Sequence, residues 1–185
     1  MRLDYNFSMR SCCCFLLLLL SPSLAYAGDL TLFAGFQKPG ELTLDPGVFP
    51  GEIVDAFSNP TDSGVFGARI NPGSGPIGLE HTLGFTPRFI DTESKGFIYN
   101  SNLLIQIPAL PVRPYGTVGA GLIHSSGNAA GVFGTSFAIN YGGGVKISIT
   151  GPIGIRIDVR GYTAPSVQGD TLHIFESSVG VVLGF

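Results

Sequence analysis

The sequence predicts an all-β chain, folded as an eight-stranded antiparallel up-and-down transmembrane β-barrel. Three observations predict it: strict alternation near the C-terminus, an even number of strands, and connections that alternate between tight and long. Along 153–162, apolar side chains alternate with arginine, aspartate, arginine and tyrosine. Because successive side chains of a strand point to opposite faces, one face is apolar and the other charged. In the last strand glycine and serine oppose the apolar face, and an apolar outside with a small, polar inside is typical of a membrane barrel.

Residues 1–27 are expected to form a secretory signal peptide, which leaves 28–185 as a single outer-membrane barrel domain. The segment has a basic start, an apolar run too short to span a membrane, and a small-x-small cleavage pattern at 25–27. All three cysteines lie within it, so no disulfide or cysteine metal site is expected in the rest. Because Arg2, Arg10 and Asp4 also lie there, the rest keeps 8 of the 10 basic and 12 of the 13 acidic residues. This acidic balance does not favour nucleic acid as a partner.

Each strand is predicted from a period-two alternation of apolar and polar side chains. Two residues depart from it: His81 interrupts an apolar face, where we expect it near an interface or a bulge, and Leu104 falls out of phase with its apolar neighbours. The predicted strands are 29–37, 63–71, 77–86, 95–107, 115–124, 136–148, 153–162 and 172–185.

The connections between these strands alternate in length. Proline and glycine mark tight turns at 72–76, 108–113 and 150–152, and longer connections are predicted at 38–62, 87–94, 125–135 and 163–171. Bacterial barrels have short periplasmic turns and longer extracellular loops, so both termini are expected in the periplasm. Segment 38–62 is expected to be a long polar loop with a short helical or extended piece at 52–57. Its acidic residues lack the spacing of a calcium-binding loop.

The polar face of the strands should line the barrel interior. Eight strands enclose a space just wide enough for side chains to fill it. A buried charge must be paired, so we expect an interlocked network of ion pairs that plugs the lumen, assisted by glycines at 142, 144, 180 and 184. A narrow, arginine-lined path for ions or solutes is the alternative. The residues expected to point inward are Arg69, Glu80, Asn140, Lys146, Arg156, Asp158, Arg160 and Glu176.

Aromatic side chains are expected in girdles at both membrane interfaces, as in other membrane barrels. The sequence has no tryptophan, so phenylalanine and tyrosine must form them. The candidates are Phe36, Phe66, Phe85, Phe97, Tyr99, Tyr115, Phe137, Tyr141, Phe175 and Phe185.

Three stretches resemble the small bacterial outer-membrane β-barrel domain family. Its members are eight-stranded, OmpA/OmpX-like barrels of the porin family. They are 119–122 (GAGL), 140–146 (NYGGGVK) and 154–160 (GIRIDVR), and the chain also ends in an aromatic residue. The resemblance implies a monomer embedded in outer-membrane lipid of a bacterium. It also implies that the barrel assembly machinery recognises the terminal strand through Phe175, Val179, Val181, Leu183 and Phe185.

Some barrels of similar size are lipid A deacylases with a His-x-Ser pair and a glutamate on the adjoining strand. Residues 124–126 supply His-Ser-Ser, but no carboxylate lies between 136 and 148, and a nucleophile needs an oriented base. His173 and Glu176 are three apart and should face opposite ways. We therefore expect no enzyme, no catalytic residue, no cofactor and no metal site.

These observations favour a structural or surface-interaction role for an outer-membrane barrel with a plugged lumen. The alternatives are a narrow channel, a lipid A-modifying barrel enzyme, and a soluble lipocalin-like carrier. The carrier requires the opposite facing, with the apolar side chains of 153–162 inside and the charged ones in water.

Overall fold

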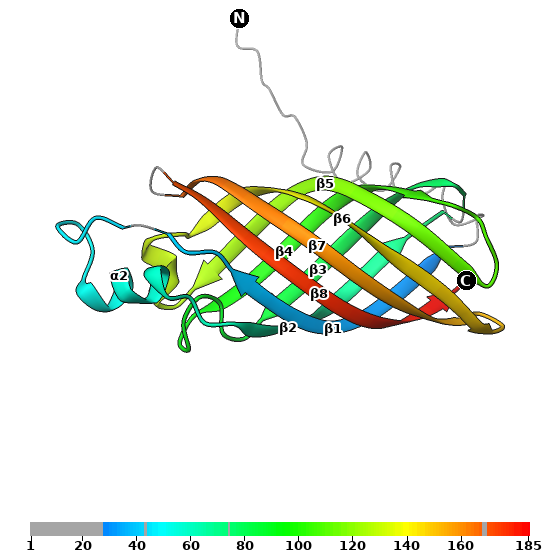
Figure 1. Ribbon diagram of the computed structural model, residues 1–185, viewed down its shortest axis with the longest axis horizontal. Coiled ribbons are helices and arrows are strands. Elements are labelled where there is room, and N and C mark those ends of the chain that lie inside the picture. Colours follow the sequence, from blue (N-terminus) through cyan, green and yellow to red (C-terminus); the bar gives the residue numbers. More distant parts are fainter. Residues whose placement is uncertain (1–27, 43, 74, 168–169) are drawn as a thin grey trace, which may run out of the picture.

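The computed structural model describes residues 28–42, 44–73, 75–167 and 170–185, so the predicted signal peptide lies outside the described residues. Eight antiparallel strands pair in chain order, and β1 pairs with β8 to close the barrel (Figure 1). This confirms the predicted fold class. The elements are β1 (Asp29–Pro39), α2 (Gly51–Ser58), β2 (Ser63–Asn71), β3 (Ile77–Thr86), β4 (Lys95–Gln106), β5 (Val112–Ser126), the 3₁₀ turn η1 (Asn128–Gly131), β6 (Thr135–Thr150), β7 (Ile153–Val167) and β8 (Asp170–Gly184).

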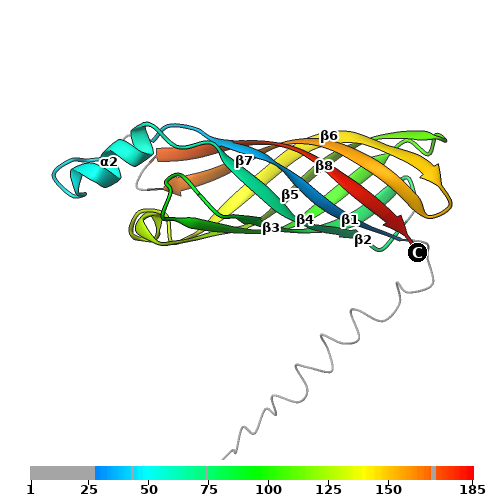
Figure 2. The same cartoon turned by 90° about the horizontal axis from the view of Figure 1, so that it is seen from below.

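The two ends of the barrel differ. Helix α2 lies at one end, together with the connections β1–β2, β3–β4, β5–β6 and β7–β8; we name this the loop end (Figures 1 and 2). The tight turns, the start of β1 and the end of β8 lie at the other, which we name the turn end. There the backbone amide of Gly28 donates to the carbonyl of Phe185 at 2.7 Å. No helix among the described residues is long and apolar enough to cross a membrane.

The alternation predicted for 153–162 is confirmed. Ile155 and Ile157 are 38% and 48% exposed on the outer wall, whereas Arg156 and Asp158 are 0% and 2% exposed inside. The barrel therefore has the facing of a membrane barrel and not that of a carrier with an apolar interior. Leu104 points inward and is fully buried, which fits the register of β4 with β3 and β5.

The outer wall is free of charge over its middle. The exposed charged residues of the strands are Lys38, Lys95 and Asp170, and each lies at the loop end of its strand. All other charged strand residues are buried or half-buried on the inner face. A band without charge is what a hydrocarbon environment demands, because a lysine or arginine at its midplane costs about 2–4 kcal/mol.

The prediction of a polar loop at 163–171 is wrong. Strand β7 continues to Val167, β8 begins at Asp170, and Ala164 and Leu172 are buried inside the extended hairpin. The prediction failed because the outward side chains in this stretch include Thr163, Pro165 and Thr171, which continue no apolar alternation. The strands continue beyond the apolar band of the outer wall, where their outward side chains no longer form an apolar face.

Other boundaries also differ from the prediction. Strand β5 begins at Val112 and runs to Ser126, so it shortens both connections that flank it. Segment 38–62 contains a helix, α2, as one of the predicted options, but it is not simply polar. Leu42, Leu44 and Phe57 are buried.

The aromatic girdles predicted at both interfaces are only half correct. Phe66, Phe85 and Phe97 form a ladder across β2, β3 and β4 near the loop end, with ring centroids 5.3 and 4.8 Å apart. Tyr115 points into the lumen instead, and Phe185 is the aromatic candidate at the turn end. His81 lies on the outer wall, where its ring stacks on Tyr99 and Nδ1 lies 3.2 Å from the hydroxyl.

Candidate functional site: the barrel lumen

The seven charged residues predicted for the lumen all point inward, and the strands bring them together with an eighth, Asp29. All eight are buried, and they divide evenly between two signs. The lumen therefore holds a charge-balanced set, which we name the charged layer. Its cations are Arg69, Lys146, Arg156 and Arg160, and its anions are Asp29, Glu80, Asp158 and Glu176.

Two arginines and two carboxylates form a ring at the centre of the charged layer. Arg156 contacts Glu80 at 2.5 Å and Asp158 at 2.8 Å. Arg160 contacts the same two carboxylates at 2.6 and 2.8 Å. The hydroxyl of Tyr115 donates to Asp158 and accepts from Arg156 Nε at 2.8 Å. Positive and negative groups alternate around this ring, so each charge has two opposite neighbours.

A second group surrounds Glu176 on β8. Arg69 Nη2 donates to Glu176 at 2.6 Å, Gln37 Nε2 at 3.0 Å and the Tyr162 hydroxyl at 3.2 Å. The Arg69 guanidinium also lies 3.7 Å from the ring centre of Phe33. This carboxylate is thus held from β1, β2 and β7 at once, which ties the seam where β1 meets β8.

The third group lies toward the turn end. Lys146 Nζ donates to Asp29 Oδ2 at 2.6 Å, joining β6 to β1 across the barrel. Asn71 Nδ2 contacts the same oxygen at 3.4 Å. The three groups together cross-link strands on opposite sides of the barrel.

Small residues make room for these side chains. A Cβ at Gly144 would lie 2.5 Å from the Tyr115 hydroxyl, and one at Gly142 would lie 2.9 Å from Arg160 Cα. The two glycines let Tyr115 and Arg160 lie against the inner face of β6.

Sequence reasoning missed Asp29, Gln37 and Tyr115 as members of the network, whereas Tyr162 lies inside as the alternation of 153–162 predicts. The signal for Asp29 and Gln37 was present, because both are in phase with Thr31 on the face opposite Leu30 and Leu32. Tyr115 was weighed as an interface aromatic, although it is in phase with Thr117, which points inward.

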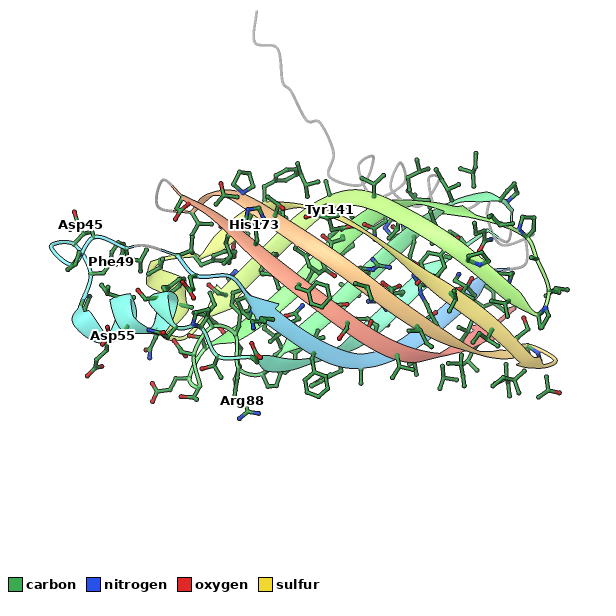
Figure 3. The ribbon with its side chains drawn as sticks, viewed as in Figure 1. Asp45, Phe49, Asp55, Arg88, Tyr141 and His173 are labelled. Carbon is green, nitrogen blue, oxygen red and sulfur yellow. The ribbon has the colours of Figure 1, made fainter. Side chains whose placement is uncertain are left out.

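A second layer closes the lumen at the loop end, and no pattern in the sequence predicts it. Apolar residues from the three longer connections pack against inward-facing residues of the strands; we name this cluster the apolar cap. Tyr162 joins the two layers, since its ring belongs to the cap and its hydroxyl reaches Glu176. The cap comprises Leu42, Leu44, Phe57, Phe89, Ile90, Ile98, Ile123, Ala129, Val132, Phe133, Ala138, Tyr162, Ala164, Val167, Leu172 and Ile174. Figure 3 shows side chains along the whole length of the barrel.

The His-Ser stretch at 124–126 does not assemble a catalytic group. His124 is exposed on the outer wall with Nδ1 2.7 Å from the Thr135 hydroxyl, whereas Ser125 is buried and donates to Ala129 O at 3.2 Å. His173 is exposed and Glu176 is buried, on opposite faces as predicted. Within the described residues, no group of three or more histidine, cysteine or acidic side chains could hold a metal ion.

Comparison with known families identifies the barrel. Residues 15–185 match the family model named "Outer membrane protein beta-barrel domain". The chain belongs to this family. Membership in the outer membrane protein β-barrel family implies the bacterial outer membrane as its location, and it agrees with the charge-free middle of the outer wall.

Solved structures show the same fold at low sequence identity. Neisserial surface protein A is 13% identical, with a TM-score of 0.65 over 86% of this chain and 99% of that one. The N-terminal β-barrel domain of Pseudomonas aeruginosa OprF is 12% identical, with a TM-score of 0.51 over 85% of this chain and 97% of that one. No curated protein matches the sequence. These likenesses extend to the fold alone.

Proposed function

We propose that the chain is a closed outer-membrane scaffold whose loop end meets the surroundings of the cell. The observation that carries the proposal is the double closure of the lumen. The charged layer fills the barrel toward the turn end, and the apolar cap fills it at the loop end. A structural or surface-interaction role needs a stable, closed barrel and exposed loops, and it needs no passage.

The charged layer supports closure through its balance. An isolated buried charge is costly, but each cation here contacts at least one carboxylate at 2.8 Å or less. Opening a path would separate these pairs, and the cost of uncovering a buried charge opposes it. The apolar cap adds a region where a hydrated ion has no polar partner.

The test is single-channel recording in planar bilayers. The wild-type barrel is expected to give no steady conductance. A combined Arg156→Ala and Phe89→Ala variant removes one bulky side chain from each layer and is expected to conduct. Steady conductance of the wild type would overturn the proposal, and the single variants report which layer controls the path.

A narrow channel is the second candidate, and one observation favours it. The side-chain amides of Asn100 and Asn140 are fully buried and have no hydrogen-bond partner among the described residues. They leave polar surface inside the barrel that a small solute or ion could use. The same recording decides between the candidates, because a channel conducts without any substitution.

We also propose that the loop end faces outward and both termini face the periplasm. The loop end carries most of the exposed acidic residues, including Asp45 and Asp55 beside and within α2 (Figure 3). Residues 28–185 contain no cysteine. A membrane-impermeant maleimide applied to intact cells should therefore label Asp55→Cys and spare Ala109→Cys at the turn end. The reverse labelling would contradict this orientation.

The proposed partners are outer-membrane lipid and, during insertion, the barrel assembly machinery, with the chain as a monomer. The proposed recognition residues of β8, together with Phe185 directly after it, all lie on the outer wall at 39–63% exposure, where a partner can reach them. Phe185→Ala is expected to lower the amount of folded barrel in cells, with Ile153→Ala at the same end as control. Equal amounts for both variants would contradict a role for Phe185 in recognition.

A further inference from the structure

One charged residue of the turn end stands outside the charged layer. Arg113 lies near the start of β5, in phase with the inward-facing Tyr115, and it is half-buried. Its Nε is buried without a hydrogen-bond partner, and the guanidinium makes no ion pair with any residue that the structure describes. A buried donor on a cation costs free energy when it stays unpaired.

The register places Arg113 beside other cations. It lies opposite Lys146 on β6, and Lys146 in turn lies opposite Arg156 on β7. Like charges directly opposite each other on neighbouring strands are destabilising. Glu80 and Asp158 compensate Arg156, and Asp29 compensates Lys146, but no described carboxylate compensates Arg113. The row therefore carries one excess positive charge.

Arg113 and Lys146 border a cavity at the turn end. The cavity has a volume of about 380 Å³, and Arg113, Lys146, Asp29 and Ser148 contribute its polar lining. Gly151, Pro152 and Phe185 also line it. Its volume lies in the lower part of the range typical of small-molecule sites. A small anion is the kind of ligand that fits both the space and the excess charge.

Asp29 narrows the chemistry of that anion. Its Oδ2 is held by Lys146 at 2.6 Å, but its Oδ1 is buried without a hydrogen-bond partner among the described residues. This second oxygen can accept a hydrogen bond. It would repel an anion that carries no proton with which to donate one. Hydrogen phosphate carries both functions, since its oxygens accept from Arg113 while its P–OH donates to Asp29.

We propose that the turn-end cavity binds a phosphate group that retains a proton. At neutral pH this describes inorganic phosphate better than a phosphate monoester, whose second pKa is about 6. Sulfate has the same shape and no proton to donate, so it is the matched control anion. Arg113 pairs with one charge of the ligand, and Asp29 selects its protonated form.

The experiment is calorimetric titration of the purified barrel in nonionic detergent and phosphate-free buffer at pH 7.5. Inorganic phosphate is expected to bind saturably at one site per chain. Sulfate and glycerol 3-phosphate are expected to bind at least roughly tenfold more weakly, the loss that one hydrogen bond to a charged group produces. Equal binding of all three would reveal an adventitious ion only, and absence of saturable phosphate binding would equally overturn the proposal.

Variants connect the binding to the residues. Arg113→Gln should weaken phosphate binding roughly tenfold or more, while Arg88→Gln, an exposed arginine at the loop end, should leave it unchanged. Asp29→Asn replaces an acceptor by an amide that can also donate, so it should reduce the preference for phosphate over sulfate. The different mobility of unheated and heated samples on a gel verifies that each variant is folded. Wild-type affinity in Arg113→Gln, or an unchanged anion preference in Asp29→Asn, would contradict the assignment.

Discussion

The two layers of the lumen close the same barrel by opposite chemistry. The charged layer consists of side chains from regular strand positions, held by pairs at defined distances such as 2.5 Å between Arg156 and Glu80. Half of the apolar cap comes from connections, as Phe57 and Phe89 do, and its residues are held mainly by apolar contact. The charged layer should therefore respond to the loss of a partner, and the cap to the loss of volume. Substitutions in each layer, on the wall and at their junction can test this difference.

The largest effect is expected in the charged layer. Arg156→Met removes a partner from both Glu80 and Asp158, and breaking a buried ion pair from one side costs about 3–5 kcal/mol of unfolding free energy. Urea unfolding in lipid vesicles, followed by the mobility of unheated samples on a gel, measures this loss. Ile157→Leu, the next residue along on the outer wall, should lose less than about 1.5 kcal/mol. Equal losses in the two variants would show that pairing does not stabilise the layer.

The apolar cap should be sensitive to volume. Phe89 is fully buried, and its ring packs against Phe133 with centroids 5.5 Å apart. Phe89→Ala should cost about 3 kcal/mol in the same urea titration, because the cavity left behind is only partly refilled. Phe89→Leu keeps most of the volume and should cost clearly less. A Phe89→Ala variant as stable as the wild type would mean that the cap is not packed.

The outer wall should reject charge according to depth. Ile157 is exposed within the apolar stretch of β7, beside the inward-facing Arg156 and Asp158, and Ile157→Lys should lose about 2–3 kcal/mol in vesicles. Ile107 is exposed beyond the end of β4 at the turn end, so Ile107→Lys should lose at most about 1 kcal/mol. The same urea titration compares Ile157→Lys with Ile107→Lys. A larger loss at Ile107 than at Ile157 would contradict the placement of the hydrocarbon band.

The smallest effect is expected where the layers meet. Tyr162→Phe keeps the ring in the cap and removes one hydrogen bond, at 3.2 Å, to Glu176. The carboxylate retains Arg69 and Gln37, so the loss should be about 1.5 kcal/mol or less. Tyr162→Leu removes both contributions and should cost more. If Tyr162→Phe is as stable as the wild type, the hydroxyl contributes nothing and the layers are independent.

The same contrast explains how far the sequence could predict the structure. The charged layer follows from alternation, because a strand position fixes the face to which Arg156 or Glu80 points. Connections have no period, so nothing in the order of residues marked Leu42 or Phe133 as part of the cap. The false loop at 163–171 has a related cause, since the outward residues of this stretch lack the apolar alternation that marks the rest of the strand. Asp29 was visible in the alternation, but its pairing with Lys146 depends on the closure of the barrel.

Fluorescence of a single introduced tryptophan tests the central claim, that the apolar side chains meet lipid and the charged ones are sealed within. The chain has no tryptophan of its own, so each variant carries one reporter. Val179 and Phe33 lie one residue apart in the β1–β8 register, the first on the outer wall and the second in the lumen. Acyl chains carrying bromine should strongly quench Val179→Trp and leave Phe33→Trp bright. Strong quenching of Phe33→Trp with none of Val179→Trp would contradict the account.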